Sequence, residues 1–314
     1  MRRALISAAA PTWRRVGEML PRPVHRLVRA APSTRTPGCS TLFLHQEAAR
    51  GSGGTGSAGT AGASESARGG DSREPPREFG RQRRQLYDSH VPTTLLEKAL
   101  LAGRAAFGAL RDPARADLVA DLGDATGAPA LAWMRRRMRE SETGRRVLEE
   151  RPRVAALAVL KQMEGYAPGT FGRAYYDFMA SHGFRPEERP TVRFVDDPEL
   201  AYIMLRYREI HDYLHVLTGL GTTVEGEIVQ KWIELVQTGL PVCALSATFG
   251  PAKLTSEERT RLLGEWLPWA IRTGVQVPFV MNIYFEDHFD EPLEEMRRRL
   301  QFPTLPYGVP RQAP

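Results

Sequence analysis

Two histidines in the string HDYLH, His211 and His215, stand four residues apart. The apolar residues that precede them recur at three- and four-residue spacing, which predicts one helix with both rings on its inward face. Imidazoles at positions i and i+4 are neighbours on a helix surface, so a single divalent cation could bind both. Zinc helices with the H-E-x-x-H pattern use this geometry, and they require at least one further ligand.

An ordinary core pair is the competing interpretation of these two histidines. A neutral imidazole has one donor and one acceptor, and each polar atom buried without a partner costs about 1–3 kcal/mol. A cation would satisfy the acceptors of both rings, but H-x-x-x-H strings also occur by chance on ordinary helices. The local string therefore leaves a metal site and a hydrogen-bonded core pair both open.

The next expected helix, over residues 223–237, offers three acids that could complete a metal site: Glu225, Glu227 and Glu234. Its main apolar arc consists of Ile228, Val229, Trp232 and Val236. On a helical wheel, Glu225 lies nearer the centre of that arc than Glu227. Spacing alone therefore favours Glu225 slightly as the additional ligand.

Helix signals recur along the part of the chain that must position these residues. Capping residues and apolar periodicity predict helices over 95–110, from 113 onward, and over 130–140, 173–183, 198–218, 223–237, 257–274 and 291–302. Asp112 is the expected cap of the second helix, and Thr255 with Glu258 forms a capping box. Two segments of strand-like composition, 191–195 and 275–285, are too few for a sheet-dominated fold. We expect a mainly α fold, a single helical domain with few short strands.

The positive charge of the chain is concentrated in its first 44 residues. They carry eight arginines, no lysine and one acid, Glu18, whereas the rest of the chain carries 35 basic and 36 acidic residues. An Arg-rich, acid-poor segment that can form a helix is typical of a mitochondrial import presequence, which is our interpretation of residues 1–44. A disordered basic tail or a membrane-surface helix is the alternative. The nearly neutral remainder disfavours nucleic-acid binding.

Residues 45–85 are expected to form a disordered linker rich in Gly, Ser, Ala and Arg. Eighteen of the twenty residues 51–70 are Gly, Ser, Thr or Ala, a composition that cannot bury enough apolar surface to fold. The expected folded domain, residues 86–314, contains no apolar run of about 18–20 residues, which disfavours a membrane-spanning helix. Two cysteines, Cys39 and Cys243, are too few for a disulfide framework or a multi-cysteine zinc site.

A long stretch around the two histidines resembles the signature of the Coq-four family of coenzyme Q (ubiquinone) biosynthesis proteins; it reads HDYLHVLTGLGTTVEGEIVQKWIELVQTGLPVC. The signature is H-D-x-x-H, eleven residues and E, and it falls here on His211, Asp212, His215 and Glu227. The likeness extends into the C-terminal YFEDHFDEPLEEMRRRLQF and spans roughly residues 86–310. The resemblance selects Glu227, against the wheel preference for Glu225.

The resemblance implies a Zn²⁺ ion held by His211, Asp212, His215 and Glu227. It also implies a carboxy-lyase of ubiquinone biosynthesis that removes the C1 carboxylate of a 4-hydroxy-3-methoxy-5-polyprenylbenzoate, in a simple or an oxidative reaction. The implied location is the matrix side of the inner mitochondrial membrane, as a peripheral protein assembled with the other ring-modifying enzymes. The alternative is a non-catalytic, zinc-stabilised, lipid-binding scaffold of that assembly. A metal-dependent phosphohydrolase is disfavoured, because further His and Asp ligands are lacking.

Asp212 has two roles that the resemblance leaves open. As a metal ligand it would complete a set of four protein ligands, which is typical of a closed structural site. As a residue behind the ligands it would orient an imidazole or a water molecule. The family pattern favours the ligand role.

Five further polar residues are weaker candidates for a functional site. Tyr202, Arg206 and Arg208 flank the histidine helix, and we expect them to be solvated rather than to contact a substrate carboxylate. Cys243 lies in an apolar run and is expected to be a packed thiol. His288 is expected in an exposed polar turn rather than at a metal.

A polyprenyl tail cannot cross water, so a protein that acts on such a substrate needs an apolar groove that the bilayer can reach. Attachment through an amphipathic surface helix is the expected solution for a chain without a spanning helix. The Arg-rich segments MRRRMRE and EEMRRRLQF are the candidates for that helix.

Overall fold

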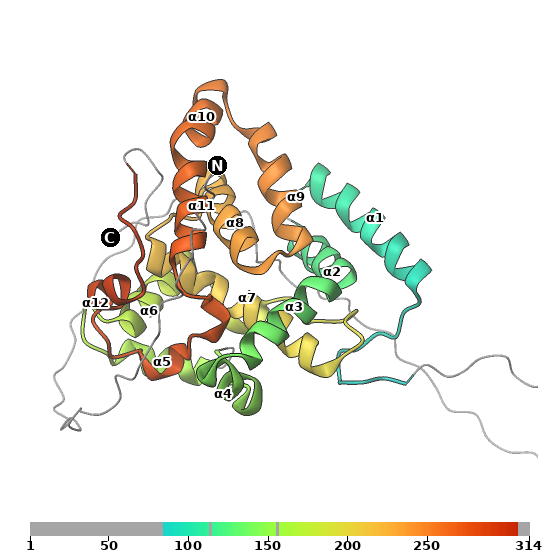
Figure 1. Cartoon of the computed structure of the whole chain (residues 1–314), viewed down its shortest axis with the longest axis horizontal. Helices are drawn as coiled ribbons and strands as arrows, with labels where there is room; N and C mark the ends of the chain where they lie inside the picture. Colours follow the sequence, from blue (N-terminus) through green and yellow to red (C-terminus); the bar gives the residue numbers. More distant parts are fainter. Residues whose placement is uncertain (1–83, 113–114, 155–156, 307–314) are drawn as a thin grey trace, which may run out of the picture. The chain divides into compact units, whose positions relative to one another are not determined.

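The computed structural model describes residues 84–112, 115–154 and 157–306, which belong to one compact unit (Figure 1). These residues form α-helices without a sheet, so the mainly α, single-domain fold is confirmed. The predicted presequence, residues 1–44, and nearly all of the predicted linker lie outside the described residues. The helices are α1 (Leu95–Arg111), α2 (Ala116–Thr126), α3 (Ala128–Arg139), α4 (Glu142–Glu150), α5 (Leu157–Glu164), α6 (Phe171–His182), α7 (Pro198–Thr218), α8 (Val224–Thr238), α9 (Pro241–Phe249), α10 (Ser256–Arg261), α11 (Leu267–Gln276) and α12 (Leu293–Arg299).

The histidine helix, α7, lies in the core of the domain. The carboxylate of Asp197 caps its N-terminus by accepting hydrogen bonds from the backbone N–H groups of Glu199 and Leu200, at 2.8 and 3.1 Å. Gly219 ends the helix in the left-handed conformation, with φ 75°. Between residues 200 and 218 every side chain except Leu205 is buried, which identifies α7 as a central helix and not a surface one.

A tight connection turns the chain from α7 into α8. The hydroxyl of Thr223 caps α8 by accepting a hydrogen bond from the backbone N–H of Gly226 at 3.3 Å. A Cβ atom at Gly226 would lie 2.0 Å from the carbonyl oxygen of Gly221, so only glycine fits at this close approach. The connection therefore places Glu227 in the first turn of α8, opposite α7.

α8 lies between two apolar clusters. The larger cluster surrounds α7 and includes residues of α3, α4, α6 and α9. The smaller one joins Ile228, Val229 and Ile233 of α8 to Trp266 and Trp269 of the α10–α11 segment. Since one face of α8 packs on the second cluster, its other face is free to meet α7.

Two helix boundaries differ from the sequence expectation. Asp112 is the C-cap of α1 and not the cap of the second helix, because α2 begins after Arg115. The helix expected over 257–274 keeps its Thr255 capping box but contains a π-helical segment, Leu262–Trp266, between α10 and α11. The π turn ends two residues before Pro268, whose missing N–H removes one bond of the α-helical ladder.

The two expected strand segments form no strand in the described part of the chain, so the expectation of few short strands is wrong. Side chains satisfy their backbone instead. The carboxylate of Asp124 accepts hydrogen bonds from the N–H groups of Arg193 and Phe194, at 2.6 and 3.3 Å. The side-chain oxygen of Gln237 accepts one from Val280 N–H at 3.0 Å. Strand-like composition in these segments therefore reflects burial, and not pairing in a sheet.

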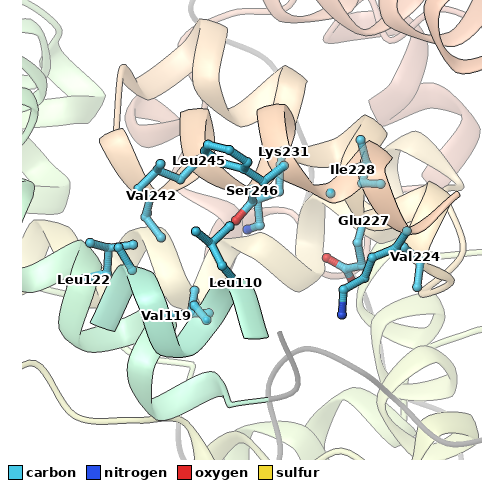
Figure 2. Close-up of a pocket in the computed structure, with 15 residues that line it drawn as sticks. Leu110, Val119, Leu122, Val224, Glu227, Ile228, Lys231, Val242, Leu245 and Ser246 are labelled. Atoms are coloured by element: carbon cyan, nitrogen blue, oxygen red, sulfur yellow. The ribbon is translucent and has the colours of Figure 1, made fainter. Parts of the chain in front are cut away.

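An apolar pocket lies between α1, α2, α8 and α9 (Figure 2). Its cavity has a volume of about 80 Å³ and is partly open to solvent. Its walls are mainly aliphatic and include Ala106, Leu110, Val119, Leu122, Val242, Leu245 and Phe249. The polar exceptions include Glu227 and Lys231 of α8, which brings the pocket to the predicted site. No helix in the described ranges has both the length and the apolar content needed to cross a membrane.

Candidate metal centre

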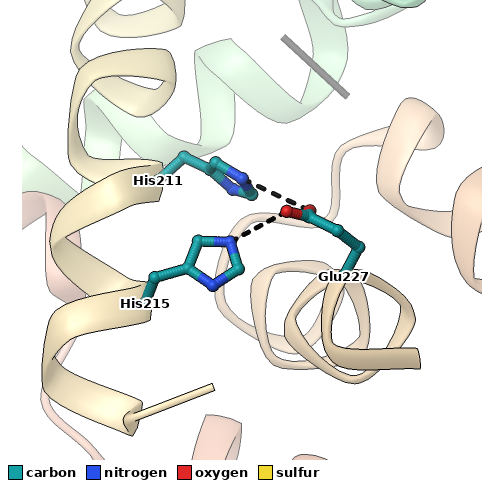
Figure 3. A group of neighbouring side chains, drawn as sticks. All are labelled: His211, His215 and Glu227. Carbon is teal, nitrogen blue, oxygen red and sulfur yellow. Dashed lines mark ion pairs between the residues drawn. The ribbon is translucent and has the colours of Figure 1, made fainter. Parts of the chain in front are cut away.

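His211, His215 and Glu227 form one buried group (Figure 3). The Nε2 atom of His215 lies 3.1 Å from Oε1 of Glu227, and Nε2 of His211 lies 3.4 Å from Oε2 of the same carboxylate. One ligand-type atom from each residue lies within 4.8 Å of the others, a separation that a single cation could bridge. The structure thus brings together three of the four residues that the sequence predicts as metal ligands.

Each imidazole has its Nδ1 atom engaged on the side away from Glu227. Nδ1 of His211 lies 2.5 Å from Oε1 of Glu234. Nδ1 of His215 lies 3.1 Å from the backbone oxygen of Leu220, in the connection after α7. Both partners are acceptors, so each ring can donate its Nδ1–H to them and present Nε2 to Glu227. Metal-binding histidines are commonly oriented by such carboxylate and carbonyl acceptors.

The carboxylate of Glu234 is itself fixed by two other groups. Lys231 Nζ donates to its Oε2 at 2.7 Å, and the Tyr207 hydroxyl donates to the same oxygen at 2.5 Å. Burial alone would raise the pKa of Glu234, but Lys231 and His211 outweigh burial and lower it below its ordinary value. Glu234 therefore stays ionised and acts as a positioning residue for the His211 ring.

The charges within the group favour a Glu227 carboxylate that faces a protonated His211 ring when no cation is bound. Burial opposes ionisation of Glu227, yet the nearby His215 and His211 lower its pKa well below the ordinary value. Burial and Lys231 lower the pKa of His211, but Glu234 and Glu227 outweigh them and raise it to about 9. A metal cation that displaces the His211 proton would keep the charge of the two carboxylates balanced.

In the described part of the chain, Nε2 of His215 and Oε2 of Glu227 are buried and make no well-aligned hydrogen bond; their contacts are the ion pairs within the group. A core pair that needed no ligand would satisfy these atoms, because a buried polar atom without a partner is costly. Two imidazole nitrogens and a carboxylate oxygen suit zinc, and three protein ligands leave a position open, as in catalytic zinc sites. The residues present therefore fit a bound metal ion.

Asp212 does not join this group. It follows His211 on α7, so its side chain leaves the helix about 100° away. Its carboxylate is buried in an ion pair with Arg189, which also donates to the Tyr175 hydroxyl at 3.3 Å. In the structure Asp212 thus holds the segment before α7 against the helix.

The polar side of α8 shows two residues whose roles the sequence did not predict correctly, Glu225 and Glu234. Glu225 is half-buried and lies outside the group, so the wheel preference for it is wrong. The helical-wheel prediction is based on the apolar arc that packs on the second apolar cluster. The buried polar side chains of α8 lie on another face. That stripe follows helical spacing and consists of Glu227, Gln230, Glu234 and Gln237. A polar stripe in an otherwise apolar helix is the signal that could have found Glu234.

Tyr202, Arg206 and Arg208, which precede the histidine pair on α7, are all buried. The expectation that these side chains are solvated is therefore wrong. Arg206 pairs with Glu286. Arg208 donates to Asp124 at 2.6 Å, and the Tyr202 hydroxyl donates to a backbone oxygen. These contacts bind α7 to its neighbours and do not reach the pocket.

The other two candidates behave as the sequence predicts. Cys243 is a buried thiol, 3.1 Å from the Tyr207 hydroxyl, and burial raises its pKa to about 12. His288 lies in a turn with its ring partly exposed, and its Nδ1 lies 2.9 Å from a carboxylate oxygen of Glu291. Neither residue belongs to the candidate metal ligands.

Fold and site together define a class: a helical protein with a buried group of two histidines and one carboxylate beside an apolar pocket. Sequence comparison gives the family. The chain belongs to the coenzyme Q (ubiquinone) biosynthesis protein Coq4 family, whose model matches residues 87–306.

Several relatives carry the name ubiquinone biosynthesis protein COQ4 homolog, mitochondrial. The Bos taurus protein is 44% identical over 225 residues, which cover 71% of this chain and 85% of that protein. The Homo sapiens protein is 43% identical over 225 residues, with coverage of 71% and 85%. The Nematostella vectensis protein is 46% identical over 196 residues, with coverage of 61% and 94%.

A solved structure has the same fold. It is the crystal structure of a Nostoc punctiforme PCC 73102 protein provisionally described as a ubiquinone biosynthesis protein. It superposes with a TM-score of 0.52 at 22% sequence identity, covering 64% of this chain and 97% of that one. At this identity the likeness supports the helical fold alone.

Proposed function

We propose that this chain catalyses the zinc-dependent removal of the C1 carboxylate from 4-hydroxy-3-methoxy-5-polyprenylbenzoate during ubiquinone biosynthesis. Family membership and the names of the relatives support the pathway. One observation carries the reaction: Glu227 and Lys231, a candidate metal-ligand carboxylate and an ammonium group, lie together in the wall of a mainly apolar pocket. Such a site suits a ligand with one charged end and one apolar end.

The pocket divides the proposed substrate into two parts. The aliphatic walls from α1, α2 and α9 suit the polyprenyl tail, because burying each CH₂ group contributes about 0.8 kcal/mol. Burial opposes the charged form of Lys231, but the adjacent Glu234 outweighs burial and raises the pKa of Lys231 above its ordinary value. Lys231 therefore stays an ammonium group and would attract the acidic end of the ring.

His211, His215 and Glu227 would hold the zinc ion. When bound, zinc supplies Lewis-acid stabilisation of negative charge on the substrate oxygens. Glu234 keeps the proton of His211 on Nδ1, so Nε2 remains a ligand. The bond between C1 and the carboxylate breaks, carbon dioxide leaves, and the electron pair stays on the ring. A proton takes the vacated position in the simple reaction, whereas the oxidative reaction needs an outside oxidant.

The alternative function is a zinc-stabilised lipid-binding scaffold without chemistry of its own. Four protein ligands sealed from solvent would favour that role. Three ligands beside a pocket that is partly open favour the enzyme. A lipid-binding scaffold would use the same pocket, so turnover is the decisive measurement.

The proposal includes a location and partners. The relatives are named as mitochondrial proteins, and the Arg-rich residues 1–44 suit an import presequence. We place the protein on the matrix side of the inner mitochondrial membrane as a peripheral protein, in one assembly with the other enzymes of coenzyme Q synthesis. Because the substrate is insoluble in water, we propose both the membrane location and the shared assembly.

The test compares Glu227→Gln with the matched control Glu225→Gln on the same helix. Metal content is measured on the purified full chain, together with carbon dioxide release from the prenylated substrate with and without oxygen. We expect Glu227→Gln to lose metal and turnover, and Glu225→Gln to keep both. Full turnover by a metal-free protein would overturn the zinc proposal. Metal binding without carbon dioxide release under either condition would favour the scaffold.

A further inference from the structure

One face of α1 is apolar and exposed. Leu96, Leu100, Phe107 and Leu110 recur at helical spacing and are 70%, 66%, 59% and 47% exposed. Small residues, Ala99 and Gly103, lie between them on the same face. We call these six residues the α1 face. Large apolar side chains exposed side by side on one helix indicate a contact surface and not scattered surface residues.

The opposite side of α1 is already used by the fold. Ala105 is buried, and Ala102 and Ala106 pack against the main core. α1 also packs closely against α2 (Figure 1). The apolar character of the α1 face is therefore not required for packing within the described chain.

Basic residues border the α1 face. Arg104 and Arg111 lie along one edge, and the Arg111 guanidinium lies 4.4 Å from the centre of the Phe107 ring. The acid of this helix, Glu97, belongs to the capping box with Thr94 at the other end. An apolar face edged by arginine is typical of a helix lying in the interface of an anionic bilayer.

The α1 face continues into the pocket. Leu110 belongs to both (Figure 2). Phe249 of α9, which is 46% exposed, also lines the pocket. Apolar surface thus runs from outside the domain to the wall that contains Glu227. A prenyl chain could follow this surface without entering water.

A second copy of the chain is a less suitable occupant. A helix of 17 residues is about 25 Å long and about 10 Å wide, so the α1 face presents about 250 Å². A stable protein interface buries about 800 Å² per partner. The arginines would also face each other across a symmetric contact and repel.

The two Arg-rich segments that the sequence suggested as membrane helices lack such a face. In α3 the large apolar residues Leu131, Met134 and Met138 are buried. In α12 the apolar Met296 is buried as well. Their arginines therefore surround helices that are anchored in the core.

We propose that the α1 face inserts into an anionic lipid bilayer and that the prenylated substrate enters the pocket there, beside Leu110 and Phe249. The lipid insertion stands on the exposed face itself, whereas the entry of substrate rests on the proposed function. This placement sets Leu110 and Phe249, which line the pocket, beside the lipid.

The test uses the full chain with Cys39→Ser, so that a single new cysteine can carry an environment-sensitive fluorophore. The label is placed at Leu100→Cys on the α1 face or, as a control, at Leu263→Cys in the α10–α11 segment. Leu263 is 56% exposed, close to the 66% of Leu100. Vesicles of phosphatidylcholine with 20% cardiolipin are added, and lipids with a quencher in the acyl chain report insertion.

We expect the label at position 100 to brighten severalfold with vesicles and to be quenched by the acyl-chain probe, while the label at 263 does not change. Because the basic N-terminus cannot move a label on α1 into lipid, binding through that segment alone would leave position 100 unchanged and overturn the proposal. A label at 100 that is shielded from water before vesicles are added would show that protein covers the face, and this too would overturn it.

A second variant separates this inference from the proposed reaction. Leu100→Glu with Phe107→Glu is expected to abolish insertion of a label at Ala99→Cys while leaving the metal content unchanged. It should also lower turnover of long-tailed substrate in vesicles more than turnover of a short-tailed analogue in solution. Insertion that persists in this variant would contradict the α1 proposal. If the parent chain, with Leu100 and Phe107 in place, turns over neither substrate, the proposed reaction is contradicted instead.

Discussion

The Nδ1 atom of His211 lies 2.5 Å from the carboxylate of Glu234, one residue in the middle of α7 and the other in the third turn of α8. This contact joins the two helices of the site behind the metal-ligand atoms. It decides which nitrogen of His211 faces Glu227, and hence whether the ring can act as a ligand.

Replacing Glu234 by Gln should weaken metal binding by about 10–100-fold without removing a ligand, because the amide no longer fixes the imidazole proton on Nδ1. Competition with a chromophoric chelator measures the affinity. The conservative Glu234→Asp variant should recover part of it if the carboxylate matters as such. Unchanged zinc affinity in Glu234→Gln would show that the contact supports only packing.

Metal affinity should rise with pH up to about 9. The folded, metal-free protein holds a proton on His211 below its raised pKa of about 9, and a metal ion must displace that proton. The apparent affinity should therefore increase about tenfold per pH unit between 6.5 and 9 and then level off. Calorimetry in two buffers of different ionisation enthalpy measures the released proton. Binding that releases no proton at pH 7 would contradict this reading.

The raised pKa of His211 also predicts how the stability of the metal-free protein depends on pH. The folded pKa of His211 lies above the ordinary value of 6.5, so protonation stabilises the fold. This contribution is fully present below pH 6.5 and is lost as pH rises toward 9. The Tm of the metal-free protein should fall over that interval, whereas the zinc-loaded protein should not follow this fall.

Asp212→Asn should lower the free energy of unfolding by about 3–5 kcal/mol, because Arg189 would remain buried without its partner. The folded fraction should still bind metal normally. Denaturant titration measures the stability, and the double variant Arg189→Met with Asp212→Leu should restore much of it. Loss of metal with stability intact would instead make Asp212 a ligand, as the sequence motif suggests.

Leu245→Trp should narrow the pocket and discriminate between substrates by tail length. Excluding two CH₂ groups from the pocket costs about 1.6 kcal/mol, which is about tenfold in affinity. KM for a long-tailed substrate should rise by at least about tenfold, while a short-tailed analogue is affected less. Leu263→Trp, outside the pocket, is the matched control. Equal effects of both variants on the long-tailed substrate would argue against this pocket.

Local signals in the sequence determined the helices of the site. Asp197 before Pro198, Gly219, and Thr223 mark the ends of α7 and the start of α8, because caps satisfy backbone groups within a few residues. The spacing of His211 and His215 likewise follows from the helix alone. By contrast, α4, α5 and α9 were not predicted, since helices of 8 or 9 residues depend on tertiary packing.

Only the tertiary structure decided which polar side chains meet. Glu225 and Glu227 are both on α8, and the choice between them depends on which face of that helix packs on Trp266 and which faces α7. The partner of His211, Glu234, lies 23 residues later in the chain. The partner of Asp212, Arg189, lies 23 residues earlier. Periodicity fixes the faces of one helix, but it contains no information on the neighbour that each face will contact.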